Sequence, residues 1–336
     1  MGLAGSVNGM RRRDFLAAVG AAAMWSRPAK AEQRRIPTIG YLNAGTLAEG
    51  PRENVVAFHK GLADTGYVQG RNVRFEFREA KGDLSLLPEL ARDLVRHEVD
   101  VILAPGSGVA AQAAKAATTT IPIVFSNAGN PLRSGLVDSL SHPGGNITGV
   151  ADFGIQLSAK RLELIKLLIP TASDVAFLAV RNQPQAAPDI AEAHERAPAL
   201  GIDVFVVRVD TVEEIDAAFA TFAERRADAV CMITNLLFFN NRERVVGLAA
   251  RYRLPTMYPF IQYTQSGGLM SYGSSLADRA YQAGVYVGQI LNGQQPGDLP
   301  IRRLTKFELA INMTTARTLG LTVPARFLAL TDQVIA

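Results

Sequence analysis

Residues 99–126, VDVILAPGSGVAAQAAKAATTTIPIVFS, contain the pattern that decides the fold. An apolar run at 99–104 is followed by a glycine-rich turn, an alanine-rich stretch with helical spacing at 108–117, and a second apolar run at 121–126. Short apolar runs rich in Val and Ile are typical of buried strands. The stretch therefore predicts two parallel strands connected by a helix.

The same alternation extends along most of the chain. In the first half, strands are predicted at 38–42, 73–78, 99–104, 121–126 and 147–150. In the second half, they are predicted at 175–180, 203–209, 229–234, 256–258 and 269–272. Helical spacing predicts helices at 52–65, 86–97, 108–117, 188–200, 212–225 and 242–252. Because the two halves repeat one plan, the sequence predicts two α/β lobes, each with a doubly wound parallel sheet.

Residues 1–31 have the features of a cleaved export signal. The sequence RRRDFL at 11–16 opens an apolar run that ends at residue 25, and an A-x-A cleavage pattern follows at 29–31. Its paired arginines indicate the twin-arginine route of a bacterium, with an ordinary secretory signal as the alternative. The run is shorter than the roughly 20 residues that a membrane-spanning helix needs. We therefore expect a soluble periplasmic protein after cleavage, with Met10 as an alternative start.

The charge balance gives no sign of an anionic partner. Five of the 35 basic residues and one of the 31 acidic residues lie within residues 1–31, so 30 of each remain after cleavage. Beyond the signal, basic residues form only isolated pairs such as Arg225-Arg226. A neutral chain without a basic patch lacks the electrostatic surface of a nucleic-acid-binding protein. No nucleic-acid partner is expected.

Length and cysteine content both indicate large packed cores. About 305 residues follow the signal, more than one hydrophobic core usually holds, so two domains are expected. The single cysteine, Cys231, lies in the apolar run 229–233 and has no disulfide partner within the chain. A buried structural thiol is the expected state, since no His or Arg flanks it to lower its pKa.

Small polar residues follow the predicted strands at their carboxyl ends. Open α/β sheets bind ligands beyond that edge, where amides and hydroxyls orient a ligand and a glycine-rich turn offers backbone N–H groups. The residues predicted to bind a ligand on this ground are Asn43, Gly106, Ser107, Ser126, Asn127, Asn130, Asn182, Asn235 and Tyr272. The same residue types cap helices and form turns, so each residue alone is equally consistent with capping. Their recurrence on one edge favours binding.

Aromatic residues also follow the strands of the second half, in predicted loops rather than on one face of a helix. They are Phe238, Phe239, Tyr258, Tyr263 and Tyr272. Core packing is the usual fate of each such residue singly, but one or two, with Phe238 and Tyr272 first, are predicted to line the cleft. A cleft of amides and aromatic rings suits a small solute with an apolar body and a few polar ends.

The chain has no complete motif of a catalytic or cofactor site. Residues 106–111 match G-x-G-x-x-A between a strand and a helix, but no acid ends the next strand, where a dinucleotide fold holds the ribose. Ser107 lacks the G-x-S-x-G spacing of a nucleophile elbow. The four histidines and the single cysteine have no zinc-ligand spacing. We therefore expect no enzymatic activity, no cofactor and no metal.

Eight short motifs occur in order along nearly the whole chain that follows the signal. They are IGY at 39–41, GYVQGRNV at 66–73, VDVI at 99–102, IPIVF at 121–125, PGGNITG at 143–149, GGLMSYG at 267–273, KFELAIN at 306–312 and LGLTVP at 319–324. Each motif is weak alone. Together they make the chain resemble the ABC transporter substrate-binding proteins that include tryptophan and tyrosine importer components.

The resemblance implies the type I periplasmic binding fold, in which two lobes are joined by three crossovers. The crossovers are expected near 151–155, 273–276 and 302–307. A helix at 278–291 is expected to return to the first lobe, and the tail from Phe307 to join the second. On this layout lobe 1 comprises 32–152 and 275–304, and lobe 2 comprises 153–274 and 305–336.

The resemblance also implies a function. It indicates a monomeric periplasmic subunit of an ABC importer, which captures a small organic solute between its lobes and delivers it to an inner-membrane permease. An aromatic or amino-acid-like solute is implied, and the family's ligand loops fall on Asn43, Ser107, Asn127, Asn182, Asn235 and Tyr272. The alternatives are an exported ligand-sensing subunit that signals to a membrane receptor, and an exported α/β enzyme.

Two positions depart from the family pattern. Asn130 precedes Pro131 where many relatives carry an acid, and Asn235 stands where an acid is common in the second lobe. Such acids suit the ammonium group of an amino acid. Their replacement by amides makes an uncharged aromatic or a carboxylate-bearing solute an alternative ligand.

Overall fold

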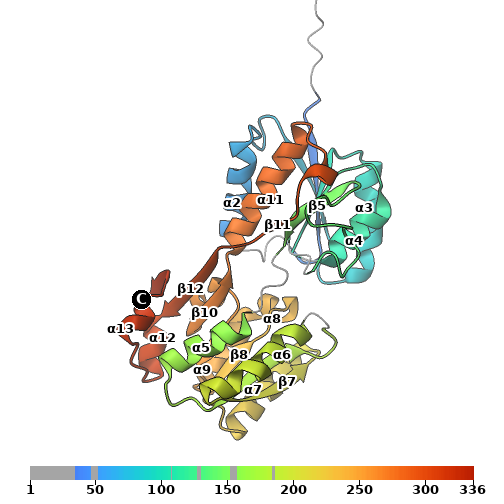
Figure 1. Cartoon of the computed structure of the whole chain (residues 1–336). Helices are drawn as coiled ribbons and strands as arrows, with labels where there is room; N and C mark the ends of the chain where they lie inside the picture. Colours follow the sequence, from blue (N-terminus) through green and yellow to red (C-terminus); the bar gives the residue numbers. More distant parts are fainter. Residues whose placement is uncertain (1–34, 47–51, 107, 127–129, 152–156, 184–185) are drawn as a thin grey trace, which may run out of the picture. The chain divides into compact units, whose positions relative to one another are not determined.

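The computed structural model describes residues 35–46, 52–106, 108–126, 130–151, 157–183 and 186–336 (Figure 1). The predicted export signal at 1–31 lies outside these residues. Residues Pro37–Ala336 form one unit by their internal contacts. This unit is built on two sheets, and its element boundaries follow the predicted strands and helices closely.

The first sheet is parallel throughout, in the order β11-β5-β4-β3-β1-β2. Its strands are β1 (Thr38–Asn43), β2 (Arg74–Glu79), β3 (Val101–Pro105), β4 (Ile123–Ser126), β5 (Ile147–Ala151) and β11 (Arg302–Arg303). The short β11 comes from near the C-terminus and pairs with β5. All six strands therefore direct their carboxyl ends to one edge.

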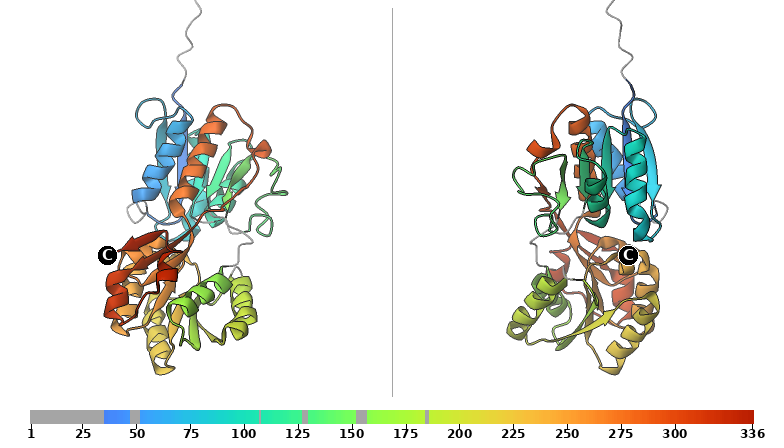
Figure 2. Two further views of the ribbon diagram at one scale, coloured as in Figure 1. Left: turned by 60° about the vertical axis from the view of Figure 1, so that its left-hand side comes forward. Right: turned by 90° about the vertical axis from the view of Figure 1, so that its right-hand side faces the viewer.

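Helices cover both faces of the first sheet because successive residues of a strand point to opposite sides. In β3, Val101 and Leu103 pack with α2 (Arg52–Asp64) and α11 (Leu276–Leu291). Ile102 and Ala104 pack instead with α3 (Leu87–Arg96), which follows the turn η1 (Leu84–Leu86), and with α4 (Gly108–Ala117). Figures 1 and 2 show α2 and α11 side by side, although more than 200 residues separate their starts.

The second sheet has the order β13-β12-β10-β9-β8-β6-β7. Its strands are β6 (Asp174–Val180), β7 (Asp203–Val209), β8 (Ala229–Met232), β9 (Thr256–Tyr258), β10 (Met270–Ser274), β12 (Phe307–Asn312) and β13 (Gln333–Ile335). One pair departs from the predicted parallel sheet, because β10 and β12 are antiparallel. The chain enters β12 from β11 of the first sheet rather than through a crossover helix, so no connection forces a parallel direction.

The second sheet is also covered on both faces. One face carries α5 (Ser158–Leu168), α6 (Ala186–Arg196) with η2 (Ala197–Leu200), α12 (Met313–Thr318) and α13 (Ala325–Leu328). The other carries α7 (Val212–Glu224), α8 (Leu236–Asn240), α9 (Arg242–Arg251) and α10 (Ile261–Gln265). The doubly wound plan predicted for each half is thus confirmed.

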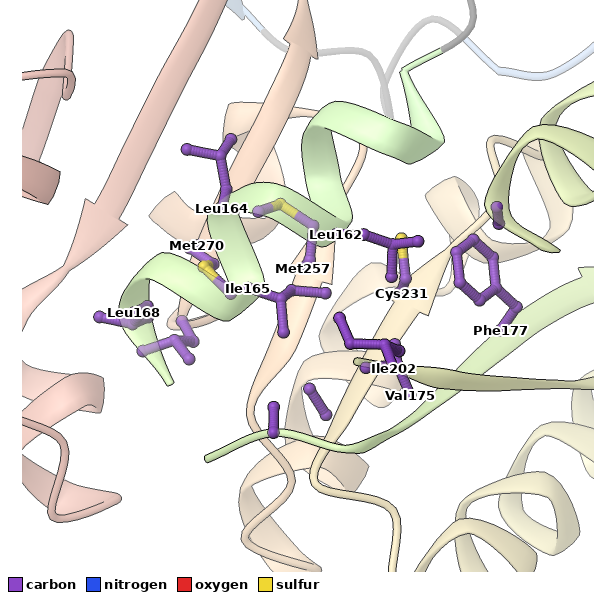
Figure 3. Close-up of a cluster of buried hydrophobic side chains, with 14 of the residues drawn as sticks. Leu162, Leu164, Ile165, Leu168, Val175, Phe177, Ile202, Cys231, Met257 and Met270 are labelled. Carbon is purple, nitrogen blue, oxygen red and sulfur yellow. The ribbon is translucent and has the colours of Figure 1, made fainter. Parts of the chain in front are cut away.

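Cys231 lies in the core under α5. Figure 3 shows its sulfur among apolar side chains that include Leu162 and Phe177. The residue has no exposed surface and forms no disulfide. Burial raises the pKa of its thiol to about 12. The predicted structural role of this cysteine is confirmed.

The chain passes between the two sheets three times, as expected. It does so between β5 and β6, between β10 and α11, and between β11 and β12. The first passage includes residues 152–156, which lie outside the described part. The turn η3 (Pro296–Asp298) connects α11 to β11. Among the described helices, none has both the length and the apolar character needed to cross a membrane.

Candidate ligand-binding site

Three predicted site residues of the first sheet meet at the carboxyl edge of neighbouring strands. Asn43 ends β1, Gly106 follows β3 and Ser126 ends β4. The backbone N–H of Gly106 donates to the carbonyl of Ser126 over 2.7 Å. Gly106 has a φ of +73°, a left-handed conformation that glycine adopts without strain. The strand order therefore brings these residues together, whereas Ser107 and Asn127 lie outside the described residues.

Two predicted asparagines have side chains engaged in local structure. The Oδ1 atom of Asn130 accepts from the backbone N–H groups of Leu132 and Arg133, at 3.1 and 3.2 Å. Asn235 caps α8 through Oδ1, which accepts from the backbone N–H of Leu237 over 2.8 Å. Its Nδ2 donates to Oε1 of Gln183 over 3.1 Å. These contacts are the capping interactions that the residue types alone had left open.

The aromatic residues of the second sheet divide into core and surface groups. Phe238, predicted to line the cleft, has no exposed surface and packs in the core of the second sheet. The next residue, Phe239, is partly exposed, and its ring centroid lies 5.9 Å from that of Phe260 and 6.1 Å from that of Tyr263. The ring of Tyr263 stacks on Tyr258 at 4.9 Å. This group of four rings, the β8–β9 aromatic cluster, comprises Phe239, Tyr258, Phe260 and Tyr263.

Tyr272 and Asn182 have different surroundings. Tyr272 is partly buried in β10, and its ring lies 6.1 Å from that of Phe307. Its carbonyl accepts a hydrogen bond of 2.9 Å from Nε of Arg161. Asn182 follows β6 and is exposed to solvent. Of these two residues, only Tyr272 lies where the chain passes between the sheets. It belongs to β10 of the second sheet, and β10 leads directly into α11, which packs on the first sheet.

Two buried arginines near this passage were not predicted. Arg161 on α5 is 4 % exposed and Arg279 on α11 is 5 % exposed. The guanidinium of Arg279 lies 5.9 Å from the ring centroid of Phe260, in the β8–β9 aromatic cluster. Neither arginine follows the end of a strand. Arg161 lies on α5, a helix that was not predicted from the sequence, so no pattern indicated its position.

A further pair of residues joins elements of the two sheets. Nε2 of Gln262 on α10 donates to Oε1 of Glu53 on α2 over 3.1 Å. Glu53 is exposed, whereas Gln262 is 5 % exposed. The two residues are 209 positions apart and belong to no short motif. Only the folded chain shows that they meet.

An aromatic group also lies at the edge of the first sheet. The ring of Tyr41 lies 5.5 Å from that of Phe77, which stacks on Phe75 at 5.8 Å. Burial, with a smaller effect from the charge of Glu79, raises the pKa of the Tyr41 hydroxyl to about 12. Tyr41 is therefore a neutral hydrogen-bonding group at any physiological pH.

Among the described residues, no group of three or more His, Cys, Asp or Glu side chains could hold a metal ion. The groups that do gather are amides, hydroxyls, aromatic rings and single charged residues. Such groups bind and orient an organic solute through hydrogen bonds and apolar contact.

Two doubly wound sheets joined by three passages define the type I periplasmic binding fold. A family model described as ABC transporter substrate binding protein matches residues 48–335, and the chain belongs to this family. A tyrosine-binding protein of Clostridioides difficile (strain R20291) is 29% identical over 265 residues, which are 79% of this chain and 75% of that protein.

Solved structures agree with this assignment. An ABC domain from Streptococcus pneumoniae in complex with L-Trp has a TM-score of 0.80 and 25% identity, and the match covers 90% of this chain and 100% of that one. A conserved domain protein from Vibrio cholerae has a TM-score of 0.79 and 25% identity, with 89% and 100% covered. The predicted family resemblance and fold class are therefore confirmed.

Proposed function

We propose that this protein is the periplasmic solute-capturing subunit of an ABC importer, and that its solute is a small molecule with an aromatic body. The observation that carries the proposal is the match to a structure that holds L-Trp, over 90% of this chain and 100% of that one. The curated relative named as tyrosine-binding supports the same class of solute. The bound solute is passed unchanged to a permease of the inner membrane.

The proposed site is the edge where strands of both sheets end. Asn43, Gly106 and Ser126 offer polar contacts from the first sheet, and Ser107 and Asn127 are assigned to it by their place in the sequence. From the second sheet we propose Tyr272 and the exposed side of the β8–β9 aromatic cluster, with Asn130, Asn182 and Asn235 shaping the loops around it. Phe238 precedes Phe239 in the chain and has no exposed surface, so we assign it a supporting role in the core rather than contact with the solute.

The chemistry of the cluster favours this type of solute. Phe239 presents a ring between those of Phe260 and Tyr263, and the guanidinium of Arg242 lies 5.6 Å from its centroid. Aromatic rings pair favourably with one another at such separations beyond the effect of area alone. An aromatic solute thus gains stacking energy that an aliphatic solute of equal size lacks.

The importer role is tested by uptake in living cells. A strain of the source bacterium that lacks this protein is supplied with labelled tyrosine or tryptophan as a trace solute. The intact gene is expected to restore uptake, and a gene without residues 1–31 is expected to fail because its product stays in the cytoplasm. Equal uptake with and without the protein, for every aromatic solute tried, would exclude the proposed import function.

A further inference from the structure

The three passages of the chain between the sheets are hydrogen-bonded to one another. The third passage follows β11, and there the backbone N–H of Leu304 donates to the carbonyl of Ala151, where the first passage begins, over 3.2 Å. The second passage follows β10, and there the backbone N–H of Ser275 donates to the carbonyl of Lys306 in the third passage over 3.4 Å. The third passage is therefore bonded to each of the other two.

Arg161 supplies the remaining link, between the first and the second passage. It lies in the first turn of α5, the helix that follows the first passage. Its Nε donates to the carbonyl oxygen of Tyr272 over 2.9 Å. Tyr272 belongs to β10, from which the second passage leaves, and its ring lies 6.1 Å from that of Phe307, the first residue of β12 after the third passage. One side chain thus connects the start of lobe 2 to the strand that leads out of it.

The backbone next to this hydrogen bond is closely packed. A Cβ atom at Gly273 would lie 1.9 Å from the carbonyl oxygen of Pro259 and 3.5 Å from Nη2 of Arg161. No residue larger than glycine fits between these groups without displacing backbone. The end of β10 therefore cannot shift far without disturbing its contact with Arg161.

Stability alone gives no reason for an arginine at this position. Arg161 is 4 % exposed, and its Nε bonds a neutral carbonyl oxygen rather than a carboxylate. Removing a cation from water costs free energy that such a bond compensates only in part. Apolar side chains of similar volume often replace buried charged groups with no loss of stability. What an apolar residue cannot supply is the directed bond to the carbonyl of Tyr272.

We propose that Arg161 is a positioning residue of the hinge between the lobes. Its bond to Tyr272 fastens the first passage to the other two, so that all three passages move as one hinge. The lobes then turn about a single axis, and solute capture starts from a narrow range of lobe arrangements. The inference goes beyond the proposed function, because it concerns the solute-free protein and holds whichever solute is captured.

The first test measures amide hydrogen exchange by NMR on the solute-free protein, on Arg161→Met and on Lys160→Met. Methionine keeps much of the apolar length of the arginine side chain and removes the hydrogen bond. Lys160→Met is the matched control, because Lys160 precedes Arg161 on α5 but is exposed. The N–H of Ser275 is expected to exchange about tenfold to a hundredfold faster in Arg161→Met, the range for loss of a hydrogen bond from a charged group. The N–H of Val230, in the centre of the second sheet, is expected to keep its wild-type rate, since local opening leaves the core folded.

The second test measures the arrangement of the lobes directly. Spin labels are attached to cysteines introduced at Ala116 on α4 and Glu195 on α6, which are exposed positions on the first and the second lobe. The native Cys231 has no exposed surface and is not labelled. The distribution of label-to-label distances in the solute-free protein is expected to be broader in Arg161→Met than in the wild type, and unchanged in Lys160→Met.

Three results would overturn the inference while leaving the proposed function in place. One is a distance distribution in Arg161→Met as narrow as that of the wild type. Another is equal broadening in Lys160→Met. The third is an exchange rate of Val230 that rises as much as that of Ser275, which would show that Arg161 supports the core as a whole. If Arg161→Met does not fold, Arg161→Lys is measured instead, and a smaller change in the same direction is expected because lysine has no Nε–H group at that place.

Discussion

At the scale of single residues, neighbours in sequence have different roles. Phe238 has no exposed surface, whereas Phe239 is partly exposed beside Phe260 and Tyr263. Phe238 was predicted to line the cleft because both residues follow a strand, and no pattern in the pair Phe238-Phe239 distinguishes them. The short helix α8 decides which ring turns inward.

The two phenylalanines predict a separation of effects. Phe239→Ala is expected to weaken binding of an aromatic solute by about tenfold and to leave the fold stable, because it removes a ring at the surface. Phe238→Ala is expected to destabilise the protein by about 3–5 kcal/mol, because it removes a fully buried ring. Calorimetry measures the first effect and denaturant unfolding the second. The assignment is wrong if Phe239→Ala binds with wild-type affinity.

Tyr41 predicts a loss of stability in alkaline solution. The pKa of its hydroxyl is raised from 10.0 to about 12 in the fold, with burial as the main cause. Between these values the unfolded chain releases the proton and the folded chain keeps it, so stability is complete below pH 10 and falls as pH rises toward 12. Each pH unit in this window costs about 1.4 kcal/mol for one such group.

The measurement is urea unfolding at pH 8 and pH 11 for the wild type and for Tyr41→Phe. Burial also raises the pKa of Tyr258 and of Tyr263, so both proteins are expected to lose stability. The loss is expected to be smaller in Tyr41→Phe. An identical loss in the two proteins would show that the hydroxyl of Tyr41 is not buried from water.

At the scale of elements, the packing of α2 against α11 depends on glycines. A Cβ atom at Gly61 would lie 2.1 Å from the carbonyl oxygen of Tyr281, and one at Gly284 would lie 2.2 Å from that of Phe58. No Cβ atom tolerates such a distance from backbone, so the helices would have to separate. The glycines thus allow α11 to lie directly on α2.

The close packing of α2 against α11 predicts that the same Gly→Ala change destabilises the fold at this contact and stabilises it elsewhere. Gly61→Ala and Gly284→Ala are each expected to destabilise the fold by about 1–3 kcal/mol through overpacking. Gly247→Ala on α9 is the control, because a Cβ there meets no atom within 4 Å. That change is expected to stabilise by about 0.4–1 kcal/mol, since alanine restricts the unfolded chain. Thermal unfolding that ranks the three variants equally would contradict the close packing.

The elements also show how far the sequence determines the fold. Strands such as β1 and β7 were predicted to within one residue, because apolar, β-branched runs bounded by polar turns mark buried strands. Helix α5 was not predicted, because buried residues such as Ser158 and Arg161 break its apolar face. The antiparallel direction of β12 could not be predicted either. Side chains alternate between the two faces of a sheet with a period of two residues, whichever way the strand runs.

The candidate site was less predictable than the fold. The positions at strand ends followed from topology alone, so Asn43, Gly106 and Ser126 could be placed on one edge. What a side chain bonds to depends on its local turn, and Asn235 proved to cap a helix. Pairs such as Glu53 and Gln262 join segments 209 positions apart, which no local pattern relates.

At the scale of the whole molecule, two sheets share one chain that passes between them three times. Multiple connections of this kind restrict how two lobes move relative to one another. A solute that contacts both lobes shifts the protein toward the arrangement it binds best. Capture without chemistry is therefore the activity that the fold, the family and the groups at the strand ends support together.

The most direct test of this account is solute binding by the purified protein. Unfolding temperature is measured with a panel of aromatic amino acids, aromatic amines, aromatic acids and aliphatic amino acids, and each solute is recovered and analysed afterwards. The account predicts that an aromatic solute at 100 times its dissociation constant stabilises the fold by about 2.7 kcal/mol and is recovered unchanged. Stabilisation by aliphatic solutes alone, or chemical conversion of the solute that binds, would contradict it.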